Sequence, residues 1–363
     1  MSVLLKLWLR RTHLILTLVS GLFLICLSIS GAILIYAKDI QQIIHPQYWT
    51  VTPQSTPLAY PVLINTLAVH SKQTVTLLMP EQQPTVAWQA QLADKNYISV
   101  NPYTGQVLLK YDYYSTLYGF TMAVHRWLLY QDADGKKPLR NWVSICALIF
   151  IINIFVGVYM WLKPKNRLKR LVIKPKAKLR ILLYQLHTVI GMYLFIPLIL
   201  IAFTGMAFHW KDETKAVLEF VTQNNVETRP TAPELEVPNI INGDNFAVAI
   251  QNALAVFPEA ELFRIYLPKK ASDPVALRVR NPDESHAYSW VWADQYTGQV
   301  LQSYDASKAN LTTRAWNFKY KFHIGDFAGF LVQMLWLLIA LLPAFFTISG
   351  GYFWYKRHYK YTF

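Results

Sequence analysis

Cysteine and the familiar catalytic motifs are almost absent from this sequence. Only two of the 363 residues are cysteines, Cys26 and Cys146, and both lie inside long apolar stretches. Two such cysteines cannot build a disulfide framework, and no C-x-x-C-H motif is present. The chain also lacks H-E-x-x-H, P-loop, G-x-S-x-G and G-x-G-x-x-G motifs. These absences argue against a disulfide-stapled domain, a zinc protease, a P-loop nucleotide hydrolase and a serine hydrolase.

Acidic residues are missing from the three segments that carry much of the basic charge. The net charge is +14, from 35 Lys and Arg against 21 Asp and Glu. Three basic residues precede residue 14, nine lie in 163–180 and three follow residue 355, without a single acid among them. The rest of the chain is nearly balanced, with 20 basic and 21 acidic residues. The excess therefore reflects membrane topology and contact with anionic lipid, and nucleic acid is excluded as a partner.

Long apolar runs are the main feature that is present. Hydrophobic residues make up 53% of the chain, and crossing about 30 Å of hydrocarbon takes roughly 20 helical residues. The sequence predicts membrane-spanning helices at 14–37, 141–162, 184–210 and 327–355. The first is too long for a signal peptide and no A-x-A site closes it, so we interpret it as a retained anchor.

The distribution of Lys and Arg predicts the orientation of these spans. Basic segments stay in the cytoplasm, so both termini and the loop 163–183 are expected there. The two long segments between the spans then lie in the periplasm, which predicts a multi-pass protein of the bacterial inner membrane. The expected organisation, in chain order, is an N-terminal tail with the first span (1–37), a periplasmic module with an interfacial helix (38–140), the second span (141–162), the basic loop (163–183), the third span (184–210), a second periplasmic module with an interfacial segment (211–326), the fourth span (327–355) and a cytoplasmic tail (356–363).

An exact repeat connects the two long segments. YTGQVL occurs at 103–108 and again at 296–301. Before each copy a stretch with helical apolar spacing, 57–71 or 244–260, is followed by runs that alternate like strands. The repeat itself contains turn residues and then resumes as a strand. Each segment is therefore expected to be one helix packed on a small antiparallel sheet.

The repeat continues into the spans. Gly31 follows His13 by eighteen residues, in SISGAI, and Gly205 follows His187 by eighteen residues, in AFTGMA. After each YTGQVL an aromatic-rich stretch carries one histidine, and each half closes with similar letters, GVYMWLK and GGYFWYK. We infer that an entire half of the protein is duplicated, which implies a pseudo-twofold axis along the membrane normal.

Four motifs carry a family resemblance: R-R-x-H at 10–13, Y-x-x-H at 184–187 with a later T-G, the N-P-Y-T-G-Q-V and D-Q-Y-T-G-Q-V turns, and VHRWLL at 124–129. With these the chain resembles the PepSY-associated transmembrane family. The resemblance implies four transmembrane helices with two periplasmic α+β PepSY-like modules. It also implies a likeness to the branch of inner-membrane siderophore reductases that contain haem and serve iron uptake. No fused flavin and nicotinamide module is visible.

Five of the nine histidines fall at or near the ends of the spans. Histidines are common at polar interfaces, but an ionisable residue in a span is also a functional candidate, and imidazole is an axial ligand of haem iron. The repeat predicts that His13 and His187 share one haem b and that His125 and His323 share a second. His209 breaks the symmetry, because span one has Ile35 at that place. It either replaces one ligand of the second pair or faces the substrate.

Glycines accompany these histidines in the spans. Gly21, Gly31, Gly191 and Gly205 allow two interpretations. They permit close approach of a planar macrocycle, or they permit close contact between helices through small residues. The sequence alone leaves both open.

These features predict an oxidoreductase that passes electrons across the membrane. A cytoplasmic reductase or membrane quinol would supply them, and a ferric siderophore in the periplasm would receive them and release Fe(II). The siderophore comes from the family resemblance alone. The alternative is a non-catalytic PepSY scaffold or regulator that binds a periplasmic peptide, protease or uptake partner, and it predicts a colourless protein.

Overall fold

The computed structural model describes residues 2–238 and 245–358 of the chain. Contacts divide the described chain into two units. A helical unit contains the residues up to Tyr36, Thr121–Leu218 and the residues from Lys319 onward. A sheet unit contains Ala37–Phe120 and Glu219–Phe318.

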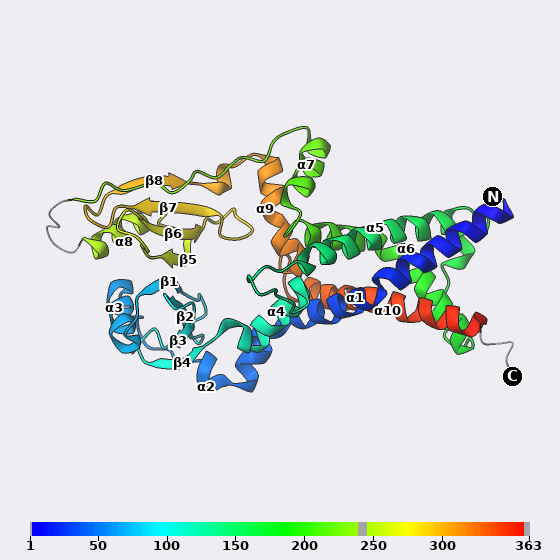
Figure 1. The fold of residues 1–363 in the computed structure, drawn as a ribbon, viewed down its shortest axis with the longest axis horizontal. Helices are drawn as coiled ribbons and strands as arrows, with labels where there is room; N and C mark the ends of the chain where they lie inside the picture. The colour runs from blue at the N-terminus through cyan, green and yellow to red at the C-terminus, as the bar shows by residue number, and fades with distance from the viewer. Residues whose placement is uncertain (1, 239–244, 359–363) are drawn as a thin grey trace. The chain divides into compact units, whose positions relative to one another are not determined.

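The helical unit is built from four helices that are long and apolar enough to cross a membrane (Figure 1). They are α1 (Val3–Ile44), α5 (Leu139–Leu162), α6 (Leu179–Met206) and α10 (Phe330–His358). Each contains a predicted span almost entirely, although α6 ends four residues before residue 210. Because α1 begins at Val3, the basic residues that precede the first span are themselves helical.

Apolar side chains lie on both the inside and the outside of these helices. Leu24, Phe150, Leu198 and Ile339 are buried where the four helices meet. Many large apolar side chains point outward instead, such as Leu22, which is 75% exposed. In water this outer surface would be unfavourable, whereas in a bilayer it is the expected one. The chain is therefore a multi-pass membrane protein.

The sheet unit contains one antiparallel sheet of eight strands, in the order β4-β3-β2-β1-β5-β6-β7-β8. The strands of the first half and of the second half thus stand side by side as two sets of four. They are β1 (Val75–Met79), β2 (Trp88–Leu92), β3 (Tyr97–Val100), β4 (Val107–Tyr111), β5 (Glu261–Tyr266), β6 (Val275–Arg280), β7 (Ser289–Ala293) and β8 (Val300–Tyr304).

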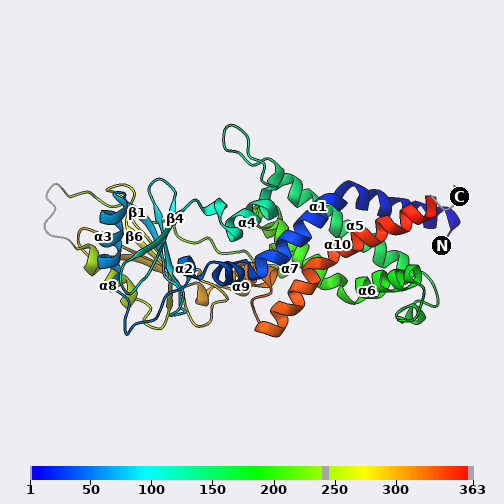
Figure 2. The ribbon, with the colours of Figure 1, turned by 90° about the horizontal axis from the view of Figure 1, so that it is seen from below.

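Two helices cover one face of this sheet, as Figure 2 shows. α3 (Tyr60–Ser71) contributes Leu63 and Leu67, and α8 (Phe246–Ala255) contributes Ile250, to a single buried core. The strands supply alternate residues to the same core, among them Leu277. The helix and strands expected in each half are all present.

The two YTGQVL copies form the same turn. Gly105 and Gly298 have φ of 75° and 76°, a backbone conformation that glycine adopts without steric cost. In each copy the glycine N–H donates to the carbonyl four residues earlier, that of Asn101 or Asp294, at 2.9 Å. The identical letters therefore serve an identical local geometry, which leads directly into β4 and β8.

The structure adds features that the sequence pattern did not indicate. The two small sheets expected as separate modules form one continuous sheet, because β1 pairs antiparallel with β5 through Leu77 with Tyr266 and Leu78 with Ile265. An additional helix, α7 (Lys211–Thr222), follows the third span. The segments expected to be interfacial are helices α4 (Leu117–Trp127) and α9 (Leu311–Ile324), and α2 (Pro46–Trp49) follows α1.

Candidate functional site

Four of the five predicted histidines meet in two pairs within the helical unit. His125 of α4 and His323 of α9 have ring centroids 6.2 Å apart, with an angle of 55° between the rings. His13 of α1 and His187 of α6 have centroids 6.4 Å apart, with an angle of 69°. We call these the α4/α9 pair and the α1/α6 pair. They are the pairs that the repeat predicted.

His125 is fixed through Nδ1. This nitrogen lies 3.1 Å from the carbonyl oxygen of Leu27 and 3.1 Å from the hydroxyl of Ser30, both on α1. A carbonyl only accepts hydrogen bonds, so Nδ1 must carry the proton. The Ser30 hydroxyl donates to the carbonyl of Cys26 at 2.7 Å, which leaves its oxygen free to accept as well. The neutral ring therefore presents the lone pair of Nε2.

His323 has the same environment on α6. Its Nδ1 donates to the carbonyl oxygen of Ile201 and to the hydroxyl of Thr204, each at 3.1 Å. The Thr204 hydroxyl in turn donates to the carbonyl of Leu200 at 2.8 Å. Burial and the neighbouring His323 lower the pKa of His125 to about 4, and burial lowers the pKa of His323 to about 4. Both rings are therefore neutral near pH 7, as ligation of a metal requires.

Two of the glycines provide the space for this pair. A Cβ on Gly31 would lie 3.0 Å from Cε1 of His125, and a Cβ on Gly205 would lie 3.2 Å from Cε1 of His323. The other two contact neighbouring helices, since a Cβ on Gly21 would meet Thr347 of α10 and one on Gly191 would approach Phe346 of α10. The glycines thus divide between accommodating an imidazole and close helix packing.

The α1/α6 pair is held differently on its two sides. Nδ1 of His187 lies 2.7 Å from the hydroxyl of Ser349 on α10, and the ring packs edge-on against Phe346 at 5.0 Å. His13 lies against α5, where a Cβ on Gly157 would come within 3.5 Å of its Cε1. Nδ1 of His13 is buried and has no hydrogen-bond partner among the residues described.

Both ring separations suit a shared metal ion. Two imidazoles that bind one metal from opposite sides, with bonds of about 2.0–2.1 Å, place their centroids about 6.3–6.5 Å apart. The observed 6.2 and 6.4 Å agree with this geometry. Within residues 2–238 and 245–358 there is no group of three or more His, Cys, Asp or Glu side chains suited to a metal ion. The donor set therefore fits a two-coordinate axial site, which is the kind that a haem needs, better than a four-ligand zinc site.

The two pairs lie at different levels of the helical unit. His13 stands eighteen residues before Gly31 on α1, and His187 stands eighteen residues before Gly205 on α6. Eighteen residues of α-helix span about 27 Å. Since Gly31 and Gly205 contact the α4/α9 pair, the two pairs are separated by most of the thickness of a bilayer.

His209 belongs to neither pair. It lies in the turn after α6, its side chain is exposed, and its backbone N–H donates to the carbonyl of Met206 at 2.9 Å. Its predicted role as a replacement ligand therefore has no support from the geometry. His323 is instead accompanied by Phe208, whose ring centroid is 5.4 Å away.

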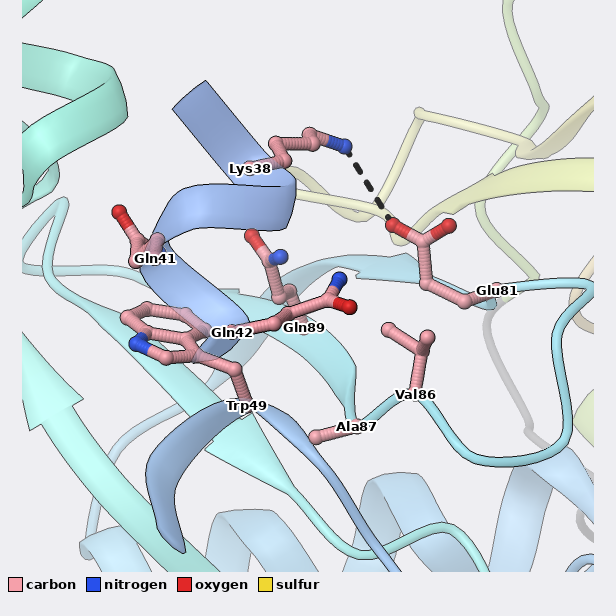
Figure 3. Close-up of a pocket in the computed structure, with 8 residues that line it drawn as sticks. All are labelled: Lys38, Gln41, Gln42, Trp49, Glu81, Val86, Ala87 and Gln89. Carbon is pink, nitrogen blue, oxygen red and sulfur yellow. Dashed lines mark hydrogen bonds and ion pairs between the residues drawn. The ribbon is translucent and has the colours of Figure 1, made fainter. Parts of the chain in front are cut away.

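The sheet unit contains a small polar hollow (Figure 3). Lys38 and Glu81 form an ion pair across it at 3.5 Å, and the side chains of Gln41, Gln42 and Gln89 lie around it. Trp49, Val86 and Ala87 complete the lining. With its cation and carboxylate already paired, the hollow has no group that suggests chemistry, so the histidine pairs remain the candidate site.

Sequence reasoning identified the paired histidines but not the residues that hold them. Ser30 and Thr204 each directly precede the matched glycine, so the letters S-G and T-G eighteen residues after a histidine were an available signal. Ser349 and the carbonyl groups of Leu27 and Ile201 had no such signal, because their roles depend on how the helices face each other.

Fold and site together define a multi-pass membrane protein whose helical unit carries two partly buried histidine pairs and whose second unit is an antiparallel sheet. The chain belongs to the PepSY-associated TM region family, whose profile matches residues 10–357. This confirms the family expected from the motifs. A search among curated proteins gave no significant match.

Proposed function

We propose that the protein is a haem-containing oxidoreductase that carries electrons across the bacterial inner membrane and reduces a ferric siderophore on the periplasmic side. The observation that carries this proposal is the presence of two partly buried histidine pairs, with centroid separations of 6.4 and 6.2 Å, at two levels of one helical bundle. A purely structural role for interfacial histidines does not require pairs at this spacing.

The residues of each pair are suited to hold one haem b. Bis-histidine haem supplies reversible one-electron transfer, and its potential depends on the ligands and their surroundings. His125, His323 and His187 each hold Nδ1 in a hydrogen bond, which orients the ring and leaves Nε2 available to bind a metal. Gly31 and Gly205 keep the space next to two of these rings open. The chain thus supplies oriented ligands and an apolar, water-poor surrounding.

The repeat and the charge distribution give this arrangement a direction. We take the chain to be two repeats of one unit, with the sheet unit in the periplasm and the basic segments in the cytoplasm. Fifteen Lys and Arg residues in the terminal and 163–180 segments support this orientation. The α1/α6 pair, which lies near the basic N-terminus, would then receive electrons from a cytoplasmic reductase or membrane quinol. The α4/α9 pair would lie near the periplasmic acceptor.

The proposed reaction is a balanced one-electron step. The ferric ion of the siderophore complex gains one electron and becomes Fe(II), while no bond of the organic ligand is broken. The lower charge of Fe(II) weakens its attraction to anionic oxygen ligands. The metal then leaves and the siderophore remains intact.

An absorption spectrum of the protein purified in mild detergent, before and after dithionite, tests the proposal. The expected result is a Soret band that sharpens and shifts on reduction, with about two b haems per chain in a pyridine haemochrome assay. The dithionite-reduced protein, freed of reductant, is then mixed with a ferric hydroxamate siderophore. We expect the haem to be reoxidised, which the Soret band reports, and Fe(II) to be captured by a ferrous chelator.

Two other outcomes separate the alternatives. A haem-containing protein that is not reoxidised by ferric siderophores retains the electron-transfer function and removes this substrate. A colourless protein that also fails to take up added haem contradicts the oxidoreductase. It favours a PepSY scaffold that binds a periplasmic peptide, protease or uptake partner.

A further inference from the structure

An asparagine is buried inside the second membrane helix. Asn153 of α5 is only 7% exposed and lies in a stretch that is otherwise almost entirely apolar. A polar amide in this environment is unfavourable unless its donors and acceptor are satisfied. The partners of Asn153 therefore indicate what the residue does.

The orientation of the Asn153 amide follows from its neighbour on α1. The hydroxyl of Thr17 donates to the carbonyl oxygen of His13 at 2.8 Å, so its proton is already used. The amide group that lies 2.9 Å from the Thr17 oxygen must then be the donor, the NH₂ group of Asn153. This assignment leaves Oδ1 of Asn153 as the acceptor, and Oδ1 is buried without a partner among the described residues.

His13 has the complementary group without a partner. Its Nδ1 is also buried, and in the described part of the chain it makes no hydrogen bond of ordinary length and angle. The ring lies beside Asn153, and a Cβ on Gly157, one turn further along α5, would come within 3.9 Å of Nδ1. Two buried polar atoms, one able to donate and one able only to accept, are thus neighbours on facing helices.

We propose that Asn153 is the positioning residue of His13: its Oδ1 accepts a hydrogen bond from Nδ1–H and fixes the tautomer that presents Nε2 to the metal. The inference rests on the proposed haem function. A hydrogen bond between the two satisfies both buried atoms at once, whereas leaving them unpaired costs about 1–3 kcal/mol for each. Metal-bound histidines commonly donate their second ring nitrogen to such an acceptor.

The second half of the chain meets the same need with different residues. Aligning GVYMWLK (157–163) with GGYFWYK (350–356) places Asn153 opposite Phe346 and Val156 opposite Ser349. His187 packs against Phe346 and uses the Ser349 hydroxyl, where His13 uses the Asn153 amide. The amide and the hydroxyl differ in acceptor strength, so the α1/α6 site has two unlike ligands although its histidines are equivalent in the repeat.

Two substitutions with opposite expected effects test this role. Asn153→Leu keeps the approximate shape and removes the acceptor, so His13 donates less charge to the iron. The midpoint potential of one haem is then expected to rise, and its haem affinity to fall about tenfold. Asn153→Asp places a carboxylate at the same atom, strengthens donation and is expected to lower the potential of the same haem. Ser144→Ala, at another buried polar residue of α5 whose hydroxyl donates to the carbonyl of Arg140, is the matched control.

The measurement is a spectroscopic redox titration of each purified variant, with the α1/α6 haem identified as the one that His187→Ala removes. Opposite shifts confined to that haem support the inference, and unchanged potentials in both Asn153 variants overturn it.

If the wild-type protein binds no haem, the proposed function fails on its own. The hydrogen bond is then read by ¹⁵N NMR of labelled histidine in the haem-free protein. An Nδ1–H tautomer of His13 that is lost in Asn153→Leu retains the positioning role, and an unchanged tautomer overturns it.

Discussion

The two histidine pairs differ in one respect: in one pair both rings have the same kinds of hydrogen-bond partner, and in the other they do not. In the α4/α9 pair, His125 and His323 each donate from Nδ1 to a carbonyl and a hydroxyl, and the two sets of acceptors stand at matching places on α1 and α6. In the α1/α6 pair, His187 has a hydroxyl partner and His13 faces an amide. The two rings of the α4/α9 pair thus have like partners at matching sequence positions, and the two rings of the α1/α6 pair do not.

This difference depends on which groups supply the hydrogen bonds. The acceptors of the α4/α9 pair include two main-chain carbonyls, Leu27 and Ile201, which any sequence provides as long as the helix remains regular. The acceptors of the α1/α6 pair are side chains of α5 and α10, and these change with a single substitution. The two rings are therefore held alike in the pair where the backbone supplies a hydrogen bond to each.

The largest expected effect is the loss of one haem without the other. Replacing His187 by Ala removes a ligand of the α1/α6 pair, and replacing His125 by Ala removes one of the α4/α9 pair. Each variant is expected to fall from about two haems to about one per chain, because a single axial histidine holds haem b much less firmly. Pyridine haemochrome assays measure this. Loss of both haems from either variant would show that the pairs are not independent.

The next largest effect concerns the space beside His125. In Gly31→Ala the new Cβ lies 3.0 Å from Cε1 of His125, so the ring must move. We expect haem affinity at the α4/α9 site to fall by roughly tenfold or more, since displaced ligands lose their alignment. Gly350→Ala is the matched control, because nothing lies within 4 Å of its Cβ. Equal haem release from both variants, measured by transfer to a scavenging globin, would contradict the role of Gly31.

A smaller effect is expected from removing hydroxyl groups that bond to the histidines. It should depend on whether the histidine Nδ1 has a second acceptor. Ser349→Ala leaves Nδ1 of His187 without its acceptor, and haem at the α1/α6 site is expected to bind about tenfold more weakly. Ser30→Ala leaves the carbonyl of Leu27 in place, so the α4/α9 site should weaken by less than about threefold. Haem-release rates of the two variants test this ranking. A larger loss in Ser30→Ala would reverse the comparison between the pairs.

The smallest expected effect is that of His209→Ala. Its side chain is exposed and contacts neither pair. Haem stoichiometry and both midpoint potentials are therefore expected to match the wild type in a redox titration. A haem content of about one per chain in this variant would identify His209 as a ligand and would contradict the α4/α9 and α1/α6 pairs as the ligand sets.

The sequence allowed much of the architecture to be predicted, and the reason is periodicity. The four spans, the helix and four strands of each half and the meeting of His13 with His187 all follow from apolar pattern and repeat spacing. The joining of β1 to β5 does not, because edge strands of small sheets carry no local sign of a distant partner. The contacts of Asn153 and Ser349 with the histidines could not be predicted for a related reason. Hydropathy identifies a membrane span but does not tell which side of the helix faces its neighbours.

The junction of β1 and β5 has a consequence for biogenesis. Leu78 and Ile265 are separated by roughly 190 residues, which take on the order of 10–40 s to synthesise at typical rates. During that time β1 is complete but presents an unpaired edge, the kind of surface that recruits other strands. Both α5 and α6 are made in the same interval, so insertion of the second and third spans precedes closure of the sheet. The edge of β1 that pairs with β5 therefore stays without this partner until the second half of the chain has been made.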